Sequence, residues 1–190
     1  MKIIITESQY KRILLQEESS NFKKGQELKG SQWLYDFIRN EEGHPKKKGE
    51  PVLKSYKIAG DVWTIGYGHT SGDVEPTVKP NMSITKDQAT KIMYNDLTSS
   101  ADCIRRIFSE WESKGINVPI TQDMFDVLVS LSFNTGCSSV RQSKFIQSLK
   151  KKKYKQAAEE IKTYNLEAGF SGLNSRRQKE SEKFLTGISV

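Results

Sequence analysis

The residues best suited to chemistry in this chain are one glutamate and one glycine-bearing stretch. Glu42-Gly43 ends an apolar helical pattern, and residues 63–70 read Trp-Thr-Ile-Gly-Tyr-Gly-His-Thr. A carboxyl group where an apolar helix meets a hairpin is partly desolvated, which favours the protonated form that a general acid needs. Gly66 and Gly68 leave one face of a strand without side chains, so an extended polymer can approach the backbone. Each feature also has an ordinary explanation, because glutamate-glycine pairs often end helices and strand glycines often mark bulges.

Two local patterns position these residues. Apolar side chains recur at helical spacing from Trp33 to Ile38, and the pattern stops at Gly43, a common helix terminator. Between residues 52 and 67 the period changes to that of strands, with residues 59–61 (Ala-Gly-Asp) as the turn of a hairpin. Glu42 is therefore predicted to face a β-hairpin.

The chain after Pro80 is predicted to be helical almost to its end. Thr85 begins a capping box for one helix, and Thr121 can cap a second helix that stops at Gly136. Further helical patterns cover residues 142–151, 154–164 and 172–185. The expected fold is α+β, with a small β-hairpin lobe, a larger helical lobe and a cleft between them.

The first 30 residues are predicted to form a separate appendage. Residues 1–18 indicate a short strand and a helix that begins at the capping box of residues 6–9, and residues 19–30 are polar and typical of a linker. We therefore expect an N-terminal appendage and linker over 1–30 and one domain over 31–190.

The composition limits the classes of partner. A net charge of +7 indicates an anionic partner: nucleic acid, a membrane surface or an anionic cell wall. The lysine clusters at 46–48 and 150–153 are not interleaved with aromatic residues, which argues against a single-strand nucleic-acid platform. The apolar run of residues 3–5 is too short for a signal peptide or a membrane span. Synthesis in a cytoplasm without stable membrane insertion is expected.

Cysteine and histidine usage predicts no metal site. Cys103 and Cys137 are interpreted as buried apolar residues of an intracellular protein. The two histidines, His44 and His69, show no zinc-ligand spacing with them. Neither a metal nor another cofactor is expected.

Four blocks of sequence, in order, resemble the phage-type lysozymes, the muramidases of glycoside hydrolase family 24. The first block combines Glu42-Gly43, Tyr56 and residues 64–69 (Thr-Ile-Gly-Tyr-Gly-His). The others are residues 84–89 (Ile-Thr-Lys-Asp-Gln-Ala), 133–136 (Phe-Asn-Thr-Gly) and 172–180 (Gly-Leu-Asn-Ser-Arg-Arg-Gln-Lys-Glu). The resemblance covers about residues 31–187.

This resemblance implies an inverting glycoside hydrolase without a cofactor. Glu42 would protonate the glycosidic oxygen between N-acetylmuramic acid and N-acetylglucosamine, and Thr64 would position a water molecule. An aspartate would stabilise the positive sugar or activate that water, with room for the water between the two acids.

The resemblance also implies supporting roles. Arg176 would form an ion pair with Glu42, and His69 would hold the hairpin lobe in place. Asn134 would contact the sugar amides, with a helix cap as the alternative, and Tyr67 and Gly66 would line the groove. Glu180 is interpreted as a member of an ordinary salt bridge.

One position departs from the family pattern. The aspartate expected two residues after Tyr56 is Ile58, which can neither stabilise a cation nor accept a proton. Asp61 and Asp73 are the nearby substitutes. Asp61 is favoured because it shares the hairpin with the missing acid, although three residues of strand place it about 10 Å from Thr64 and on the opposite face.

The predicted function is that of an endolysin, a peptidoglycan hydrolase for host-cell lysis with antimicrobial activity. The alternative is a non-catalytic, wall-binding or virion-associated protein, supported by Ile58 and opposed by the retained Glu42 and Thr64. A nucleic-acid-binding protein rests on charge alone, and no such module is present. We expect a monomer that acts on glycan strands of the wall. Before lysis it would lie in the host cytoplasm and depend on a separate membrane-permeabilising protein, or else it would be carried in the virion.

Overall fold

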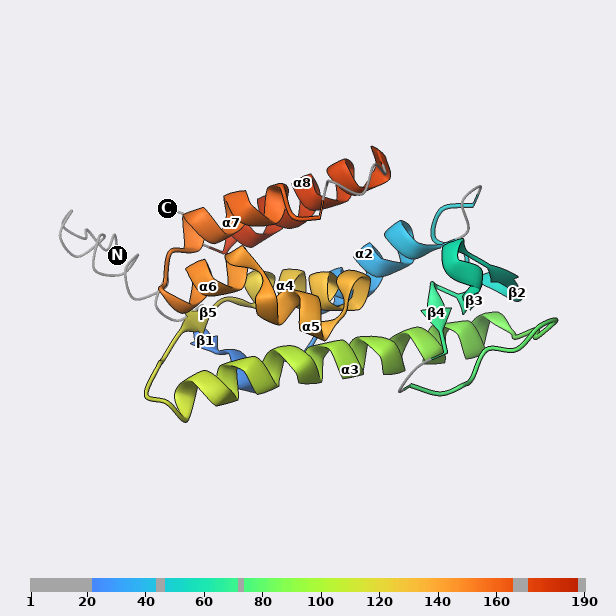
Figure 1. Cartoon of the computed structure of the whole chain (residues 1–190), viewed down its shortest axis with the longest axis horizontal. Helices are drawn as coiled ribbons and strands as arrows, with labels where there is room; N and C mark the ends of the chain where they lie inside the picture. The colour runs from blue at the N-terminus through green and yellow to red at the C-terminus, as the bar shows by residue number, and fades with distance from the viewer. Residues whose placement is uncertain (1–21, 44–46, 72–73, 166–170, 188–190) are drawn as a thin grey trace, which may run out of the picture.

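The hairpin lobe is built from three short antiparallel strands. The computed structural model describes residues 22–43, 47–71, 74–165 and 171–187. Strand β2 (Val52–Lys57) pairs with β3 (Trp63–Gly66), which pairs with β4 (His69–Thr70). The predicted turn is the 3-10 segment η2 (Ala59–Asp61), in which Gly60 has a φ of 81°. Figure 1 shows this small sheet at one end of the molecule, beside the end of helix α2 and the start of α3.

The helical lobe makes up the rest of the described chain. It contains α2 (Gln32–Glu42), α3 (Lys86–Glu112), α4 (Gln122–Thr135), α5 (Cys137–Gln142), α6 (Lys144–Lys150), α7 (Tyr154–Lys162) and α8 (Ser171–Thr186). Helix α4 lies between α3 and the pair α7 and α8 (Figure 1), and its side chains are buried almost throughout. This arrangement confirms the predicted α+β fold, with a small β-hairpin lobe and a larger helical lobe.

The helix starts agree with the capping signals in the sequence. Thr85 accepts a hydrogen bond from the Gln88 amide, and the Gln88 side chain accepts one from the Thr85 amide. Thr121 accepts from the Met124 amide at 3.3 Å, and α4 ends at Gly136, whose φ of 84° suits glycine. The short helix α5 was not predicted, since it follows Gly136 directly.

Residues 22–30 differ from the polar linker expected there. Strand β1 (Lys23–Lys24) pairs with β5 (Pro119–Ile120), and the 3-10 turn η1 (Gly25–Glu27) packs on α3. A Cβ atom on Gly25 would lie 2.5 Å from the Phe108 ring, so only glycine fits. Residues 22–30 therefore contact the helical lobe, and Leu28 is buried against it, which a linker would not require. The predicted strand and helix of residues 1–18 lie outside the described residues.

The two cysteines correct another expectation. Cys103 of α3 and Cys137 of α5 form a disulfide, with Cα atoms 5.9 Å apart and a sequence separation of 34. They were interpreted as unpaired apolar residues because nothing in their spacing indicates contact. The bond is possible because α5 returns along α3 after the turn at Gly136.

Candidate active site

Glu42 is the last residue of α2, and the packing of that helix fixes where its carboxylate lies. Leu34, Phe37 and Ile38 bury one face of α2. The start of the helix is held by the buried Asp126 of α4, which accepts hydrogen bonds from the Ser31 amide at 3.1 Å and from the Ser31 hydroxyl. Since α2 is anchored at its start and along one face, its final residue has a defined position.

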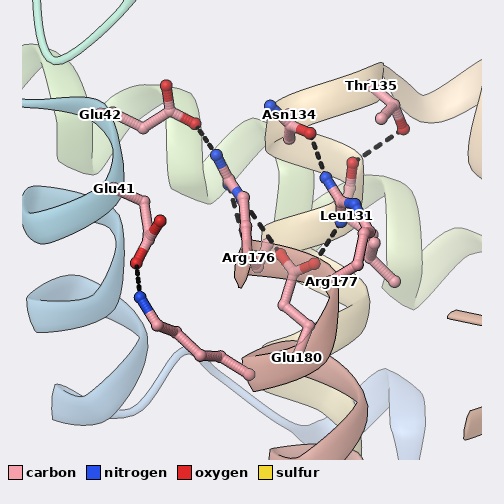
Figure 2. A network of polar contacts seen from close by, with 10 residues as sticks. Glu41, Glu42, Leu131, Asn134, Thr135, Arg176, Arg177 and Glu180 are labelled. Carbon is pink, nitrogen blue, oxygen red and sulfur yellow. Dashed lines mark hydrogen bonds and ion pairs between the residues drawn. The ribbon is translucent and has the colours of Figure 1, made fainter. Parts of the chain in front are cut away.

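The two oxygens of the Glu42 carboxylate have different surroundings. Oε1 accepts a hydrogen bond from Nη1 of Arg176, a buried residue of α8 (Figure 2). Oε2 faces Gly68, where a Cβ atom would lie 3.3 Å away and the φ is 86°. The Glu42 side chain is 19% exposed. A glycine at this position therefore leaves space beside an oxygen that could donate a proton.

The hairpin presents two further polar side chains near Glu42. Burial raises the pKa of the Tyr56 hydroxyl, and the negative charge of Glu42 raises it further. Thr64 is the register partner of Tyr56, and directly opposed residues of an antiparallel pair point to the same face. Thr64 is 2% exposed, and its hydroxyl donates to the Val62 carbonyl at 3.4 Å. Both side chains thus belong to one face of the hairpin, and the Tyr56 hydroxyl of that face interacts with the Glu42 charge.

A cleft extends from this point between the two lobes. Its lining on the hairpin side comes from residues 68–70, and on the helical side from α3 and the junction of α4 and α5, including Ser99, Ser100 and Phe133. Gly68 belongs to both the cleft and the surroundings of Glu42. A pocket therefore lies between the hairpin and the helical lobe, and Gly68 is the residue that it shares with the surroundings of Glu42.

A buried network connects Glu42 with the interior of the helical lobe (Figure 2). Arg176 also donates from Nε to Glu180 at 3.2 Å, and Arg177 donates to Glu180 and to Oδ1 of Asn134. Burial by itself would lower the pKa of Arg176, but the charges of Glu42 and Glu180 raise it overall. The Arg176 guanidinium is thus a permanent cation shared between two carboxylates.

His69 occupies a structural position between the lobes. Its Nδ1 donates to Asp96 of α3 at 2.9 Å, and its Nε2 donates to the Pro76 carbonyl at 2.8 Å. Burial by itself would lower the pKa of His69, but these hydrogen bonds and the charge of Asp96 raise it above its ordinary value of 6.5. Both ring nitrogens act as donors only in the imidazolium form. This placement favours the anchoring role over a catalytic one.

The other groove residues expected from sequence lie deeper than a substrate contact requires. Tyr67 is buried, and its hydroxyl donates to the Gly49 carbonyl at 3.2 Å. A Cβ atom on Gly66 would meet Ala89 and Ile84 at 3.6 and 3.7 Å. These placements favour packing roles for Tyr67 and Gly66, whereas Gly68 borders the glutamate.

The structure also locates the candidates for the missing acid. Ile58 is 44% exposed, next to the turn. The Asp61 side chain is 87% exposed, and its carboxylate pairs with Lys57 at 3.0 Å. Asp73 lies outside the described residues. Asp61 is therefore a solvated carboxylate on the hairpin, and its ion pair with Lys57 is a surface pair, which contributes little energy.

Sequence reasoning did not assign functions to three residues of these networks. Arg177 and Glu180 belong to the block at 172–180, so a paired-charge motif was visible, but its partners were not. Asp96 gave no signal, because it resembles any exposed helix residue until His69 is placed against it. Within the four described ranges no group of three potential metal ligands occurs, and no helix there is long and apolar enough to cross a membrane.

Comparisons with known proteins show what this chain is similar to. The model of the family described as phage lysozyme matches residues 47–180. The endolysin of Bacillus phage B103 is 32% identical over 163 residues, covering 84% of this chain and 55% of that protein. The endolysin of Salmonella phage P22 is 31% identical, covering 74% of this chain and 91% of that protein. The solved structure of the endolysin from Escherichia coli O157:H7 phage FAHEc1 has a TM-score of 0.66 at 28% identity, covering 86% and 97% of the two chains.

The lengths of these relatives differ. This chain spans about half the length of the matched endolysins of Bacillus phages B103 and PZA. It spans most of the P22 endolysin.

Proposed function

The chain belongs to the phage lysozyme family, as its motifs predicted, and we propose that it is a peptidoglycan hydrolase that cleaves between N-acetylmuramic acid and N-acetylglucosamine. The observation that carries this proposal is the orientation of the Glu42 carboxylate, with one oxygen held by Arg176 and the other facing Gly68, which also lines the pocket between the lobes. An oriented acid beside a groove without side chains is what cleavage of a polymer requires.

In the proposed reaction Glu42 gives its proton to the glycosidic oxygen as the bond from that oxygen to the anomeric carbon breaks. A water molecule attacks the anomeric carbon from the opposite face, which inverts its configuration. Thr64, on the hairpin face that meets Glu42, positions this water. Arg176 then stabilises the carboxylate that Glu42 becomes after it has released its proton.

The proton of the attacking water needs an acceptor, and we assign this role to Asp61. Its carboxylate is on the same hairpin as the vacated family position at Ile58 and forms an exposed ion pair with Lys57 at 3.0 Å. Movement of the short η2 turn would bring it toward the anomeric carbon, and Asp73 is the alternative. Asp61 shares the hairpin with Ile58, and its side chain is 87% exposed and so can move, which supports this assignment.

The proposed partner is the glycan strand of the cell wall, bound by a monomer. A disulfide persists in oxidising surroundings, so the Cys103–Cys137 bond suits action after the protein has left a reducing cytoplasm. Passage from the cytoplasm would require a separate membrane-permeabilising protein. Carriage within a virion would avoid that requirement.

Substitution of Glu42 tests the function. Glu42→Gln should reduce wall lysis by about a hundredfold to ten-thousandfold, because removal of a general acid has this effect. The measurement is clearing of a peptidoglycan suspension together with release of reducing sugar ends. Glu41→Gln is a matched control: it removes the neighbouring carboxylate, which pairs with Lys179 at 2.7 Å outside the cleft. Lysis by Glu42→Gln at the wild-type rate would refute the assignment.

A wall-binding protein without activity is the second candidate, and Ile58 favours it. In that case the wild-type protein would sediment with peptidoglycan and release no reducing ends.

A further inference from the structure

Glu180 is a fully buried carboxylate with every oxygen engaged. Its Oε1 accepts hydrogen bonds from the Ser130 hydroxyl at 2.6 Å and from Nε of Arg176 at 3.2 Å. Its Oε2 accepts from Nη1 of Arg177. Glu180 and Arg177 are 0% exposed. Burial of such a group is costly, and apolar side chains of similar volume often give equal or greater stability. The network therefore calls for an explanation beyond the packing of α8 on α4.

Both guanidinium groups held by Glu180 continue to residues of the proposed site. Nη1 of Arg176 donates to Oε1 of Glu42, and Nη2 of Arg177 donates to Oδ1 of Asn134 (Figure 2). A guanidinium is a planar fork, so fixing one edge fixes the direction of the other. One buried carboxylate thus sets the direction of two side chains that extend to opposite parts of the site.

The Arg176 connection affects the charge balance at Glu42. A cation close to a carboxylate favours the ionised form, which a general acid must avoid before it reacts. Arg176 also pairs with Glu180, which adds a second negative charge beside the guanidinium. Glu180 therefore weakens the effect of the Arg176 charge on Glu42. Two other titratable groups of the described chain interact with the Glu42 charge. Burial lowers the pKa of Arg177 of α8, against the charges of Glu180 and Glu42, which raise it. Burial raises the pKa of Tyr56 of β2, and the Glu42 charge raises it further.

The Arg177 connection determines what Asn134 can offer to a ligand. Arginine is only a donor, so the amide oxygen of Asn134 must face it and the amide NH₂ must point elsewhere. In Figure 2 the amide nitrogen of Asn134 points to the side on which Glu42 lies. A fixed NH₂ donor matches the carbonyl oxygen of a sugar acetamido group.

We propose that Glu180 is a positioning residue of this site, which directs Arg176 toward Glu42 and Arg177 toward Asn134. The inference rests on the proposed function, because it assigns to Glu180 an effect on both acid catalysis and recognition of N-acetylated sugars.

The first test is Glu180→Gln, assayed with soluble glycan fragments over a range of pH. Loss of the Glu180 charge leaves Arg176 committed to Glu42, so Glu42 should ionise more readily. The alkaline limb of the pH–rate profile should therefore move to lower pH, and kcat should fall about tenfold or more. KM should rise, because Asn134 loses its orientation. Asp123→Asn is the control, because it removes another α4–α8 ion pair, with Lys183 at 2.9 Å, without touching either arginine. This control should keep the wild-type pH profile.

A second variant separates the two connections. Arg177→Lys lacks the fork and cannot hold Glu180 and Asn134 together. It should raise KM about tenfold and leave the alkaline limb in place. If Glu180→Gln does not fold, Glu180→Asp replaces it: the charge remains, but the shorter side chain cannot hold both guanidinium groups, so kcat should fall and KM should rise.

Two outcomes would overturn the proposal. One is a Glu180 variant that lowers the melting temperature while kcat, KM and the pH profile stay unchanged, since Glu180 would then be a structural brace alone. The other is an unchanged KM in Arg177→Lys. A wild-type protein that releases no glycan fragments would instead refute the proposed function. An active wild type, with Glu180 variants whose kcat, KM and pH profile equal those of the wild type, would refute only the positioning role.

Discussion

Reduction of the Cys103–Cys137 disulfide should destabilise the fold measurably. The bond closes a segment with a sequence separation of 34 residues, which comprises the end of α3, strand β5 and all of α4. The chain-entropy relation for a loop of this length gives about 4 kcal/mol of stabilisation, through restriction of the unfolded chain. For a protein of this size such a loss lowers the melting temperature by about 8–16 °C.

Thermal unfolding followed by circular dichroism, with and without a thiol reductant, measures this effect. A variant with both Cys103→Ser and Cys137→Ser is the control, because its melting temperature should match the reduced wild type and should not respond to the reductant. Thiol titration under denaturing conditions reports whether the bond was present at the start.

Two results would refute the reasoning. An oxidised wild type that melts at the same temperature as the double variant would show that the bond adds no stability. An equal effect of reductant on both proteins would show that the reductant acts elsewhere.

Three other perturbations test the site and the domain boundary. Asp61→Asn should lower lysis about tenfold or more and Asp73→Asn should leave it near wild type, if Asp61 accepts the proton of the attacking water. The raised pKa of His69 adds stability to the folded state. This stability is complete below the ordinary pKa of 6.5 and is lost as the pH rises through the pKa of His69 in the folded protein. The difference in melting temperature between wild type and Asp96→Asn should therefore become smaller at alkaline pH. A chain that starts at Ser31 should be less stable than one that starts at Phe22 by at least about 2 kcal/mol in denaturant unfolding, because burial of Leu28 and the β1–β5 pair are lost.

Each of these expectations has a contrary result. Loss of lysis only in Asp73→Asn would transfer the role to that residue, and full activity in both variants would mean that Glu42 and Thr64 suffice. A constant gap across the pH range would show that His69 does not titrate with unfolding. Equal stability of the two truncated chains would restore the boundary at residue 31.

Local patterns in the sequence determined the elements and the chemical type of the site. Helix caps at Thr85 and Thr121, the stop at Gly136 and the hairpin turn depend on hydrogen bonds within a few residues, so their signals are readable in order along the chain. The blocks that contain Glu42 and Arg176 could be recognised for the same reason, since each is a short contiguous motif.

Tertiary structure decided which of these residues act together. The disulfide, the β1–β5 pair and the contact between His69 and Asp96 join segments far apart in sequence, and no local period encodes such partners. The same holds for Glu180: its position in a motif was visible, but its hold on two arginines depends on how α8 packs against α4. A charged residue on a helix has the same local pattern whether it faces solvent or a buried residue of opposite charge, and only packing distinguishes the two.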